Sequence, residues 1–256
     1  MEKGLLALAD RLRAAGIHLA LCLVVAALVA LVVFLCWYPA PFADLTHVAP
    51  IFLMLVGIDI VVGPALTLIV AKPSKPRAEL LRDLSVIALL QLGALAYGLH
   101  SVASARPVAL VFEVDLFRLV TANEIDVPAL AEAPAPLREL SWRGPRLMAV
   151  VKPDDPDEQL RTIDLGLAGV PLAALPKYWR DYESHADEAW RKARPVALLL
   201  EKYPQVAADV QAAAEAAGQP AGALRFLPLL SRQASWVTVM APGAKVLVHL
   251  PVDGFF

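Results

Sequence analysis

Three long uncharged runs constrain this chain more than any other feature of its sequence. Residues 17–36 are twenty uncharged residues dominated by Leu, Val and Ala, enough to cross a hydrocarbon core of about 30 Å. Residues 48–71 contain one formal charge, at Asp59, and residues 84–103 contain none. We therefore predict three membrane-spanning helices over these ranges, packed as antiparallel neighbours in one unit over residues 17–103.

A cleaved signal peptide is the alternative interpretation of the first run. Such a peptide has an apolar core of about 7–15 residues that ends at a small-residue cleavage site. Here the run is longer, and it leads into Trp37 and Tyr38, where the aromatic residues of a membrane interface are expected. The sequence therefore favours an uncleaved helix.

Basic residues next to the runs predict the orientation of the chain, because they are retained on the cytoplasmic side. They lie before the first run and between the second and third: Lys3, Arg11, Arg13, Lys72, Lys75, Arg77 and Arg82. The loop between the first two runs has none. We expect a bacterial inner-membrane protein with a cytoplasmic N-terminus and a periplasmic C-terminal domain. Residues 1–16 would form a cytoplasmic amphipathic tail, either an extension of the first helix or an anchor in the interface.

Residues 104–256 carry charged side chains throughout and predict a soluble domain. Strands rich in β-branched residues are expected at 107–114 and 146–152, and again near the C-terminus, where residues 236–252 read as a hairpin around Pro242-Gly243. Helices are expected at 153–169, 182–193 and 204–218. This order predicts an α+β domain with a mainly antiparallel sheet. The Ala- and Pro-bearing connection 124–145 has no clear assignment.

The sequence offers little support for catalysis, metal binding or nucleic-acid binding. The net charge is −2, no basic stripe is interleaved with aromatic residues, and no phosphate-binding or nucleophile motif is present. The five histidines lack the helical spacing of a metal site, and Cys22 and Cys36 would lie about 21 Å apart on one helix, too far to pair. We expect no enzyme activity, no metal and no cofactor. The acids at 154–158 read as a capped helix start rather than a calcium loop.

Asp59 is the most informative residue of the predicted membrane unit. A carboxylate near the middle of a span costs about 2.5–3.5 kcal/mol on insertion scales, so it should face other helices or a partner, or be protonated. In an antiparallel hairpin it would lie near the level of Gln91, and Gln91 and Tyr97 are its expected hydrogen-bond partners.

Three small or helix-perturbing residues follow Asp59 in the same span. Gly63 allows close helix approach, and Pro64 frees a backbone carbonyl that Thr67 or a neighbouring helix could help to satisfy. Three interpretations remain open for this group: a polar clasp within the three helices, a docking point for another protein's membrane helix, and a proton or ion path. The last has little support because a single acid without a relay is poor material for a transporter.

Taken in order, several segments resemble the type IV pilin accessory protein family (TfpX/TfpZ type). They are WYP at 37–39, IDIVVGPALTLIV at 58–70, RDLSVIALLQLGALAYG at 82–98, RPVALVFEVDLFRLVTANEI at 106–125, and the closing LRFLPL and VHLPVDG. The resemblance rests on the order and spacing of these segments. The matching positions are Trp37, Tyr38, Pro39, Asp59, Gly63, Pro64, Thr67, Asp83, Leu84, Gln91, Tyr97, Gly98, Arg106 and Pro107.

The resemblance implies an inner-membrane protein that assists stable accumulation or assembly of its cognate type IV major pilin, without enzymatic activity. Its partners would be the lipid bilayer and the pilin, with the three helices sheltering the pilin membrane helix and the domain from Arg106 onward contacting the pilin head. One alternative is a membrane-anchored periplasmic ligand-binding or sensor domain acting through a partner. Another is an enzyme acting on periplasmic or lipid substrates, although no residue is nominated as its nucleophile.

Overall fold

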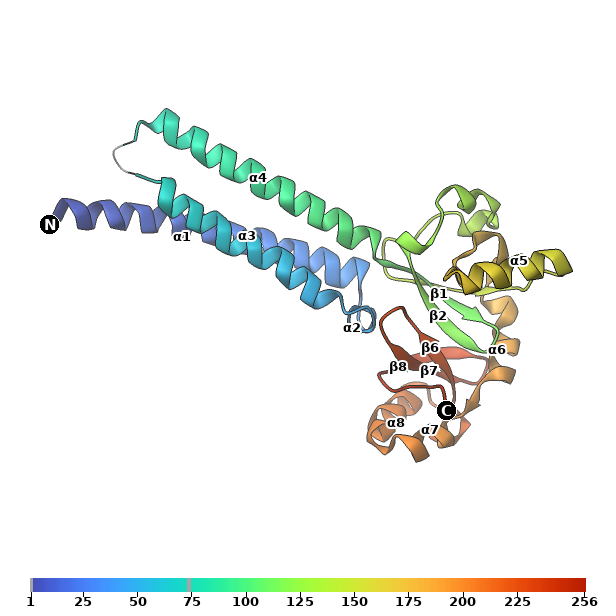
Figure 1. Ribbon diagram of the computed structural model, residues 1–256. Coiled ribbons are helices and arrows are strands. Elements are labelled where there is room, and N and C mark those ends of the chain that lie inside the picture. The colour runs from blue at the N-terminus through green and yellow to red at the C-terminus, as the bar shows by residue number, and fades with distance from the viewer. Residues whose placement is uncertain (1, 73–74) are drawn as a thin grey trace. The chain divides into compact units, whose positions relative to one another are not determined.

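The computed structural model describes residues 2–72 and 75–256, and the side chains of residue 8 onward within them (Figure 1). Lys3 and the start of the predicted amphipathic tail therefore lie outside the described side chains. The chain divides into two compact units. We call the residues up to Cys36 together with His47–Ser104 the helical unit, and Trp37–Thr46 together with Ala105–Phe256 the sheet unit.

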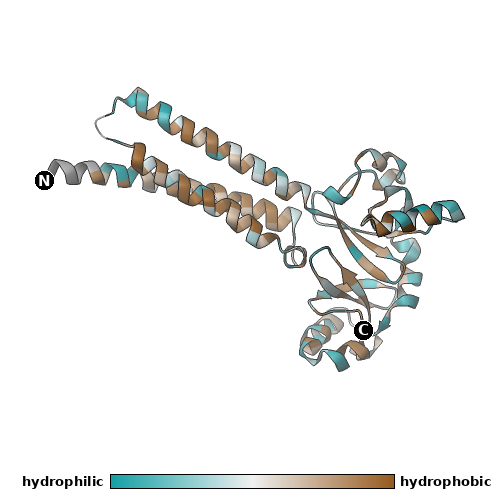
Figure 2. Cartoon of the chain, in the orientation of Figure 1, coloured by the Kyte–Doolittle hydropathy of each residue, from teal (hydrophilic) through white to brown (hydrophobic). Residues whose placement is uncertain are grey.

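Three helices form the helical unit: α1 (Glu2–Leu31), α3 (Val48–Val70) and α4 (Arg77–Ser104). The π-helical segment Val32–Trp37 extends α1. In the described part of the chain three segments are long and apolar enough to cross a membrane: Leu8–Trp37, Val48–Val70 and Arg77–Ser104. Figure 2 shows hydrophobic residues along most of each helix. The prediction of three long apolar helices is confirmed, and the third begins at Arg77, about two turns earlier than expected.

The helix α3 packs against both α1 and α4. It runs without a break through Pro64, so the Gly-Pro pair does not end the helix. Large apolar side chains such as Leu53, Leu89 and Leu90 point outward and are 67%, 72% and 66% exposed. Such exposure is costly in water and ordinary in contact with lipid.

The sheet unit is built on one eight-stranded sheet. Its strands are β1 (Pro107–Glu113), β2 (Leu116–Thr121), β3 (Arg146–Val150), β4 (Trp179–Asp181), β5 (Arg194–Pro195), β6 (Arg225–Leu230), β7 (Ser235–Ala241) and β8 (Lys245–Leu250). The spatial order is β4-β3-β1-β2-β6-β7-β8, and β5 pairs with β6. Most of these strands were expected, and the closing β7–β8 hairpin turns at Gly243, where φ is +79°.

The expectation of a mainly antiparallel sheet is wrong, because the sheet is mixed. Pairs β1–β2, β3–β4, β5–β6, β6–β7 and β7–β8 are antiparallel, whereas β1–β3 and β2–β6 are parallel. Parallel neighbours need long crossover connections, and the chain supplies two. The connection 124–145 returns the chain so that β3 runs beside β1, and the helical region before β6 returns it so that β6 runs beside β2.

The helices of the sheet unit are α5 (Pro156–Leu167), α6 (Ala186–Lys192), α7 (Val196–Lys202) and α8 (Ala207–Ala216), with the short α2 (Phe42–Leu45) in the loop between α1 and α3. The three predicted helical regions are confirmed, whereas α7 was not predicted. Asp155 caps α5 by accepting a 3.0 Å hydrogen bond from the backbone N–H of Glu158, and Pro156 occupies the first helical position.

Both faces of the central strand β1 are buried. On one face Ala109 and Val111 pack in a cluster with Trp179, whose indole N–H donates to the carbonyl of Ala173 at 2.8 Å. On the other face Leu110 and Phe112 pack in a second cluster with strands β6 and β7. Burial on two faces explains why the PVALVFE segment is continuously apolar rather than alternating.

Candidate functional site

A groove of about 150 Å³ lies within the helical unit, lined by α1, α3 and α4. Four of its lining residues have polar side chains: His18, Cys22, Asp59 and Gln91. The remaining lining residues are apolar, namely Leu21, Val25, Ala26, Val56, Ile60, Ala88, Leu92 and Leu95. The groove is therefore an apolar trough with a few polar groups drawn from all three helices.

Gln91 of α4 is the centre of the polar contacts. Its Nε2 donates a 3.0 Å hydrogen bond to the backbone carbonyl of Asp59 and lies 3.8 Å from Cys22 Sγ. A carbonyl can only accept, so the amide nitrogen must face Asp59 and the amide oxygen must point elsewhere. That oxygen, Gln91 Oε1, is buried and has no hydrogen-bond partner among the described residues. The amide nitrogen of Gln91 therefore makes a hydrogen bond within the described residues, and the amide oxygen makes none.

Gly63 makes room for the Gln91 amide. A Cβ atom built on Gly63 would overlap the Gln91 side chain, which lies 2.6 Å away even at its Cδ. The same geometry recurs where Gly98 of α4 faces Leu55 of α3. Glycines at these positions let the helix backbones approach closely, as is common between membrane helices.

Thr67 and Tyr97 occupy different places relative to the groove. Thr67 is 2% exposed, and its Oγ1 lies 2.5 Å from Nδ1 of His18, so it joins α3 to α1. Tyr97 is 77% exposed and lies outside the groove lining. The structure thus brings Asp59, Gly63 and Gln91 together and leaves Tyr97 apart from them.

His18 was not singled out by the sequence prediction. Counting residues along the antiparallel helices α1 and α3 could have found it, because His18 and Thr67 are polar residues near the same end of this helix pair. Asp83, the remaining predicted residue of α4, lies outside the groove and bonds to Lys75 at 2.5 Å.

The other family-motif residues gather in the sheet unit, around Trp142. The ring of Trp37 lies 6.0 Å from that of Trp142, and the Arg106 guanidinium lies 3.5 Å from the Trp142 ring centre. The Nε of Arg106 donates to the carbonyl of Ser141 at 3.0 Å. A planar cation over an indole face is a favourable contact, stronger when shielded from water.

Tyr38 and Pro39 complete this cluster. Tyr38 is 1% exposed, and burial raises the pKa of its phenol while the nearby charge of Arg106 acts in the opposite direction. Burial in turn lowers the pKa of Arg106. Pro39 packs on Gly144, where an added Cβ would come within 2.7 Å of the proline Cγ and φ is +68°. Pro107 opens β1 directly after Arg106. Trp142 and Gly144 were missed because they lie in the unassigned connection 124–145.

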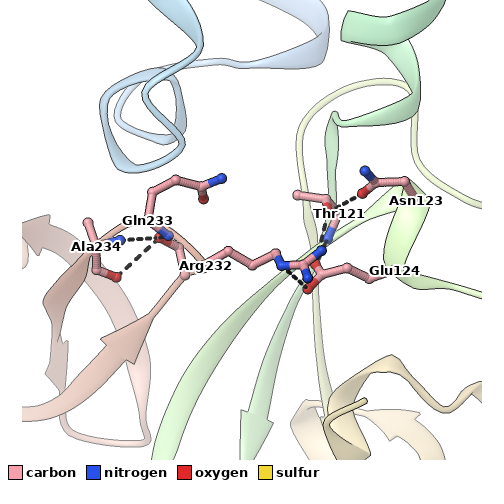
Figure 3. Close-up of polar contacts among 7 residues, drawn as sticks. Thr121, Asn123, Glu124, Arg232, Gln233 and Ala234 are labelled. Atoms are coloured by element: carbon pink, nitrogen blue, oxygen red, sulfur yellow. Dashed lines mark hydrogen bonds and ion pairs between the residues drawn. The ribbon is translucent and has the colours of Figure 1, made fainter. Parts of the chain in front are cut away.

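The rest of the loop 37–46 is also buried in the sheet unit. Leu45 is 0% exposed, and its carbonyl accepts a 3.0 Å hydrogen bond from the Ser231 hydroxyl. The β6–β7 turn that carries Ser231 is held at its next residue, where Arg232 Nε lies 3.7 Å from the carboxylate of Glu124 (Figure 3). Phe42 packs against the ring of His249 on β8 at 5.4 Å.

These contacts have a topological consequence. Because residues 37–46 and 105–256 fold as one body, they must occupy the same side of any membrane that the chain crosses. The helices α3 and α4 lie between them in sequence, so either both cross the membrane or neither does.

Metal binding has no support in the described part of the chain, where His, Cys, Asp and Glu side chains do not gather in groups of three.

Comparison with known proteins identifies the family. A model described as "Fimbrial assembly protein FimB" matches residues 7–47. Over 242 residues, 94% of each chain, this protein is 32% identical to "Fimbrial assembly protein, serogroup I" of Dichelobacter nodosus and 31% identical to the serogroup E1 protein of that organism. The chain belongs to this family of fimbrial assembly proteins. The resemblance to type IV pilin accessory proteins is thereby confirmed.

A third fimbrial assembly protein of D. nodosus, of serogroups C1 and C2, is 41% identical over 118 residues, which are 46% of this chain and 90% of that one. No solved structure matches this chain. The residues matched by the fimbrial assembly model cover α1 and the loop that carries Trp37, Tyr38 and Pro39, so the family signature includes the segment buried in the sheet unit.

Replacing Gly63 by Ala should displace the Gln91 amide, because the added Cβ would overlap it. We expect the free energy of unfolding of the helical unit to fall by roughly 1–3 kcal/mol, as for other overpacked sites. Thermal unfolding in detergent, followed by far-UV circular dichroism, measures this change. The matched control is Gly57→Ala in the same helix, where an added Cβ meets nothing within 4 Å. Equal melting temperatures for the two variants would contradict the close fit of Gly63 and Gln91.

His249 should make the sheet unit sensitive to acid. Burial lowers the pKa of His249 to about 4, and its Nδ1 lies 3.0 Å from the hydroxyl of the buried Thr238. An unfolded histidine titrates near pH 6.5, so between about pH 6.5 and 4 the unfolded chain binds a proton that the folded chain does not. Stability should be complete above pH 6.5 and fall by up to about 3 kcal/mol toward pH 4.

Tryptophan fluorescence measures this loss selectively, because all five tryptophans belong to the sheet unit. Denaturant unfolding at pH 7.5 and pH 4.5 should show a smaller difference for His249→Gln than for the unchanged protein. The matched control is His185→Gln, which should keep the full difference. The same pH dependence in all three proteins would rule out His249 as its source.

Proposed function

We propose that this protein is an inner-membrane, chaperone-like assembly factor that stabilises a cognate type IV major pilin before or during pilus assembly. Two relatives that span 94% of this chain are named fimbrial assembly proteins, which supports the role in assembly. The observation that carries the proposal further is the groove between α1, α3 and α4. We assign this groove to the membrane helix of the pilin.

The size and chemistry of the groove suit a helix partner better than a small molecule. Its volume, about 150 Å³, is below the range of about 300–1,000 Å³ that is usual for ligand pockets. A volume of this size would accommodate one or two apolar side chains of a neighbouring helix. Small residues at its wall, Cys22, Ala26 and Ala88, permit close approach, which is how membrane helices associate.

The proposed orientation has a cytoplasmic N-terminus and a periplasmic sheet unit. The basic side chains Arg11 and Arg13, and those between α3 and α4, favour the cytoplasm, whereas residues 37–47 contain no Lys or Arg. The packing of residues 37–46 into the sheet unit supports this arrangement, since both would then be periplasmic. The pilin head would be reached from the same side.

The helix α5 offers a surface for the pilin head. None of its residues is buried, and its apolar side chains Leu160, Ile163 and Leu167 are 61%, 58% and 85% exposed. Their i, i+3, i+7 spacing puts them on one face of the helix. An exposed apolar stripe on a domain that faces water is typical of an interaction surface.

A ligand-binding or sensor function is the second candidate. The observation that favours it is an open cleft of about 450 Å³ in the sheet unit, lined by Glu113, Arg118, Lys152 and Thr162 among others. Its volume is within the usual range for small ligands. A sensor role would predict no pilin in contact with the helical groove.

Photo-crosslinking in a piliated strain tests the assembly role. A photoreactive amino acid at Leu21, which lines the groove and is 62% exposed, should form an adduct with the pilin. The same residue at Leu23, 49% exposed on the opposite side of α1, is the matched control and should not. Antibody to the pilin detects the adduct. Failure of Leu21 to form a pilin adduct would overturn the assignment of the groove.

Substitution on α5 tests the contact with the pilin head. Replacing Leu160 and Leu167 by Ser should weaken pilin co-purification roughly tenfold, a change of about 1.4 kcal/mol in binding free energy. Stability should be nearly unchanged because both side chains are exposed. The control is Val127→Ser, at a 64% exposed residue elsewhere on the sheet unit. Undiminished co-purification with the doubly substituted protein would argue against α5.

A further inference from the structure

We propose that the sheet unit contacts the lipid surface through Trp37, Trp142 and Arg143, and that these residues bind phospholipid headgroups through their phosphate. We call the three residues the interface patch. The inference goes beyond the role in pilus assembly, and it rests on the part of the proposed function that places the helices across a membrane. The observation behind it is that an exposed tryptophan is held beside the points where the chain leaves its apolar helices.

Trp142 lies next to the end of the first apolar segment. That segment covers Leu8–Trp37, and the ring of its last residue lies 6.0 Å from the ring of Trp142. The uncharged run 17–36 spans about 30 Å as a helix, the thickness of the hydrocarbon core, so Trp37 follows at the boundary with the headgroups. Trp142 would lie at this boundary for any orientation of the sheet unit, because both tryptophans belong to that unit.

The end of the third apolar helix gives a second, independent constraint. Arg106 follows α4 by two residues. Its Cζ lies 3.5 Å from the ring centre of Trp142, and its Nε donates to the carbonyl of Ser141 at 3.0 Å. Pro39, in the loop after the first apolar segment, packs on Gly144. The segment 141–144 is therefore held in place by residues that adjoin two of the three apolar helices.

The patch has the chemistry of a membrane interface. Trp142 is 57% exposed although Arg106 lies over its ring, and an indole with one apolar and one polar part is favoured where hydrocarbon meets water. Arg143 is exposed, and its guanidinium has no hydrogen bond or ion pair with any residue that the structure describes. Its neighbours Arg138 and Arg146, by contrast, donate to backbone carbonyls. A free guanidinium matches the geometry of a phosphate group.

Charge and position both favour a lipid over a second protein at this patch. Segments 37–46 and 138–146 together contain three arginines and two acids, Asp44 and Glu139, which gives them a net charge of 3 − 2 = +1, whereas the whole chain has −2. A positive charge close to the membrane is attracted to anionic headgroups. Because the patch adjoins the helix ends, the headgroups of the same membrane are always within reach, as for any tethered partner.

Brominated phospholipids test the contact, because bromine quenches the fluorescence of a tryptophan that it touches. The full chain is placed in bilayers of phosphatidylethanolamine and phosphatidylglycerol that carry bromine near the headgroup end of the acyl chains. We expect Trp37 and Trp142 to be quenched, so Trp142→Phe should lower the quenched part of the emission by about half. The matched control is Trp190→Phe on α6, which lies away from α2 within the sheet unit, and it should leave the quenched part unchanged (Figure 1).

The variant Arg143→Gln tests the binding of phosphate and keeps every tryptophan in place. Arg143 is exposed, so the fold should be unaffected. Quenching is compared between bilayers in which only phosphatidylglycerol or only phosphatidylethanolamine is brominated. The preference for phosphatidylglycerol should fall about fivefold, which corresponds to about 1 kcal/mol for one arginine near an anionic surface. The control is Arg161→Gln, an exposed arginine of α5, which should keep the full preference. An equal preference in all three proteins would overturn the inference.

The possible failures can be told apart. Absence of any quenching by brominated lipid in the unchanged protein would contradict the membrane-spanning arrangement itself. Quenching that is undiminished in Trp142→Phe would contradict the patch alone. If iodide, which stays in water, quenched Trp142 while brominated lipid did not, the patch would face water and be open to a protein partner, and the inference would again be wrong. The Leu21 adduct tests the role in pilus assembly separately.

Discussion

The burial of the loop 37–46 in the sheet unit is the constraint on which the rest of the structure depends. Leu45 is as buried as any residue of the β-sheet core, and Tyr38 is nearly so. The loop joins α1 to α3, and the sheet begins only two residues after α4 ends. Three helix ends are thus tied covalently to one folded body. The fimbrial assembly family model that matches residues 7–47 covers this loop as well as the first helix.

In the helical unit, by contrast, the helices are joined by a few polar contacts within otherwise apolar surroundings. Gln91 bonds to a backbone carbonyl of α3, and His18 bonds to Thr67 of the same helix. Both contacts join α3 to a neighbour, and neither uses the Asp59 carboxylate. The acid that is most conspicuous in the sequence therefore contributes its backbone carbonyl to the helix packing, and Asp59 is among the residues that line the groove.

Hydropathy was enough to predict the three helices, because a run of about twenty apolar residues is typical of a membrane-spanning helix and of few other structures. The strand β2 was harder to recognise. It follows β1 through a turn at Val114, which adopts φ +62°. A β-branched residue rarely has this conformation, so the sequence lacks the Gly or Asn that usually indicates a hairpin. Because β2 was not predicted, its parallel pairing with β6 could not be predicted either.

The candidate site was predictable in part. Counting along antiparallel helices places Asp59 near the level of Gln91 and Gly63 one turn away. In the structure Gln91 contacts both residues, and it bonds to the backbone carbonyl of Asp59 rather than to its carboxylate.

The sequence predicts that the aromatic residues Trp37 and Tyr38 of the WYP segment lie at the membrane interface. Their contacts with Trp142 and Gly144 join segments about 100 residues apart, and no local pattern reports such tertiary packing.

The loop also decides where this protein can be cut. A fragment starting at residue 105 would contain every strand and would still be missing part of its own core, because the places of Tyr38 and Leu45 would be empty. A water-soluble version suited to crystallisation or binding assays would need residues 37–46 joined through a linker to the start of β1. The natural domain boundary is thus discontinuous in the gene, and a truncation based on hydropathy alone would remove a piece of the folded domain together with the membrane helices.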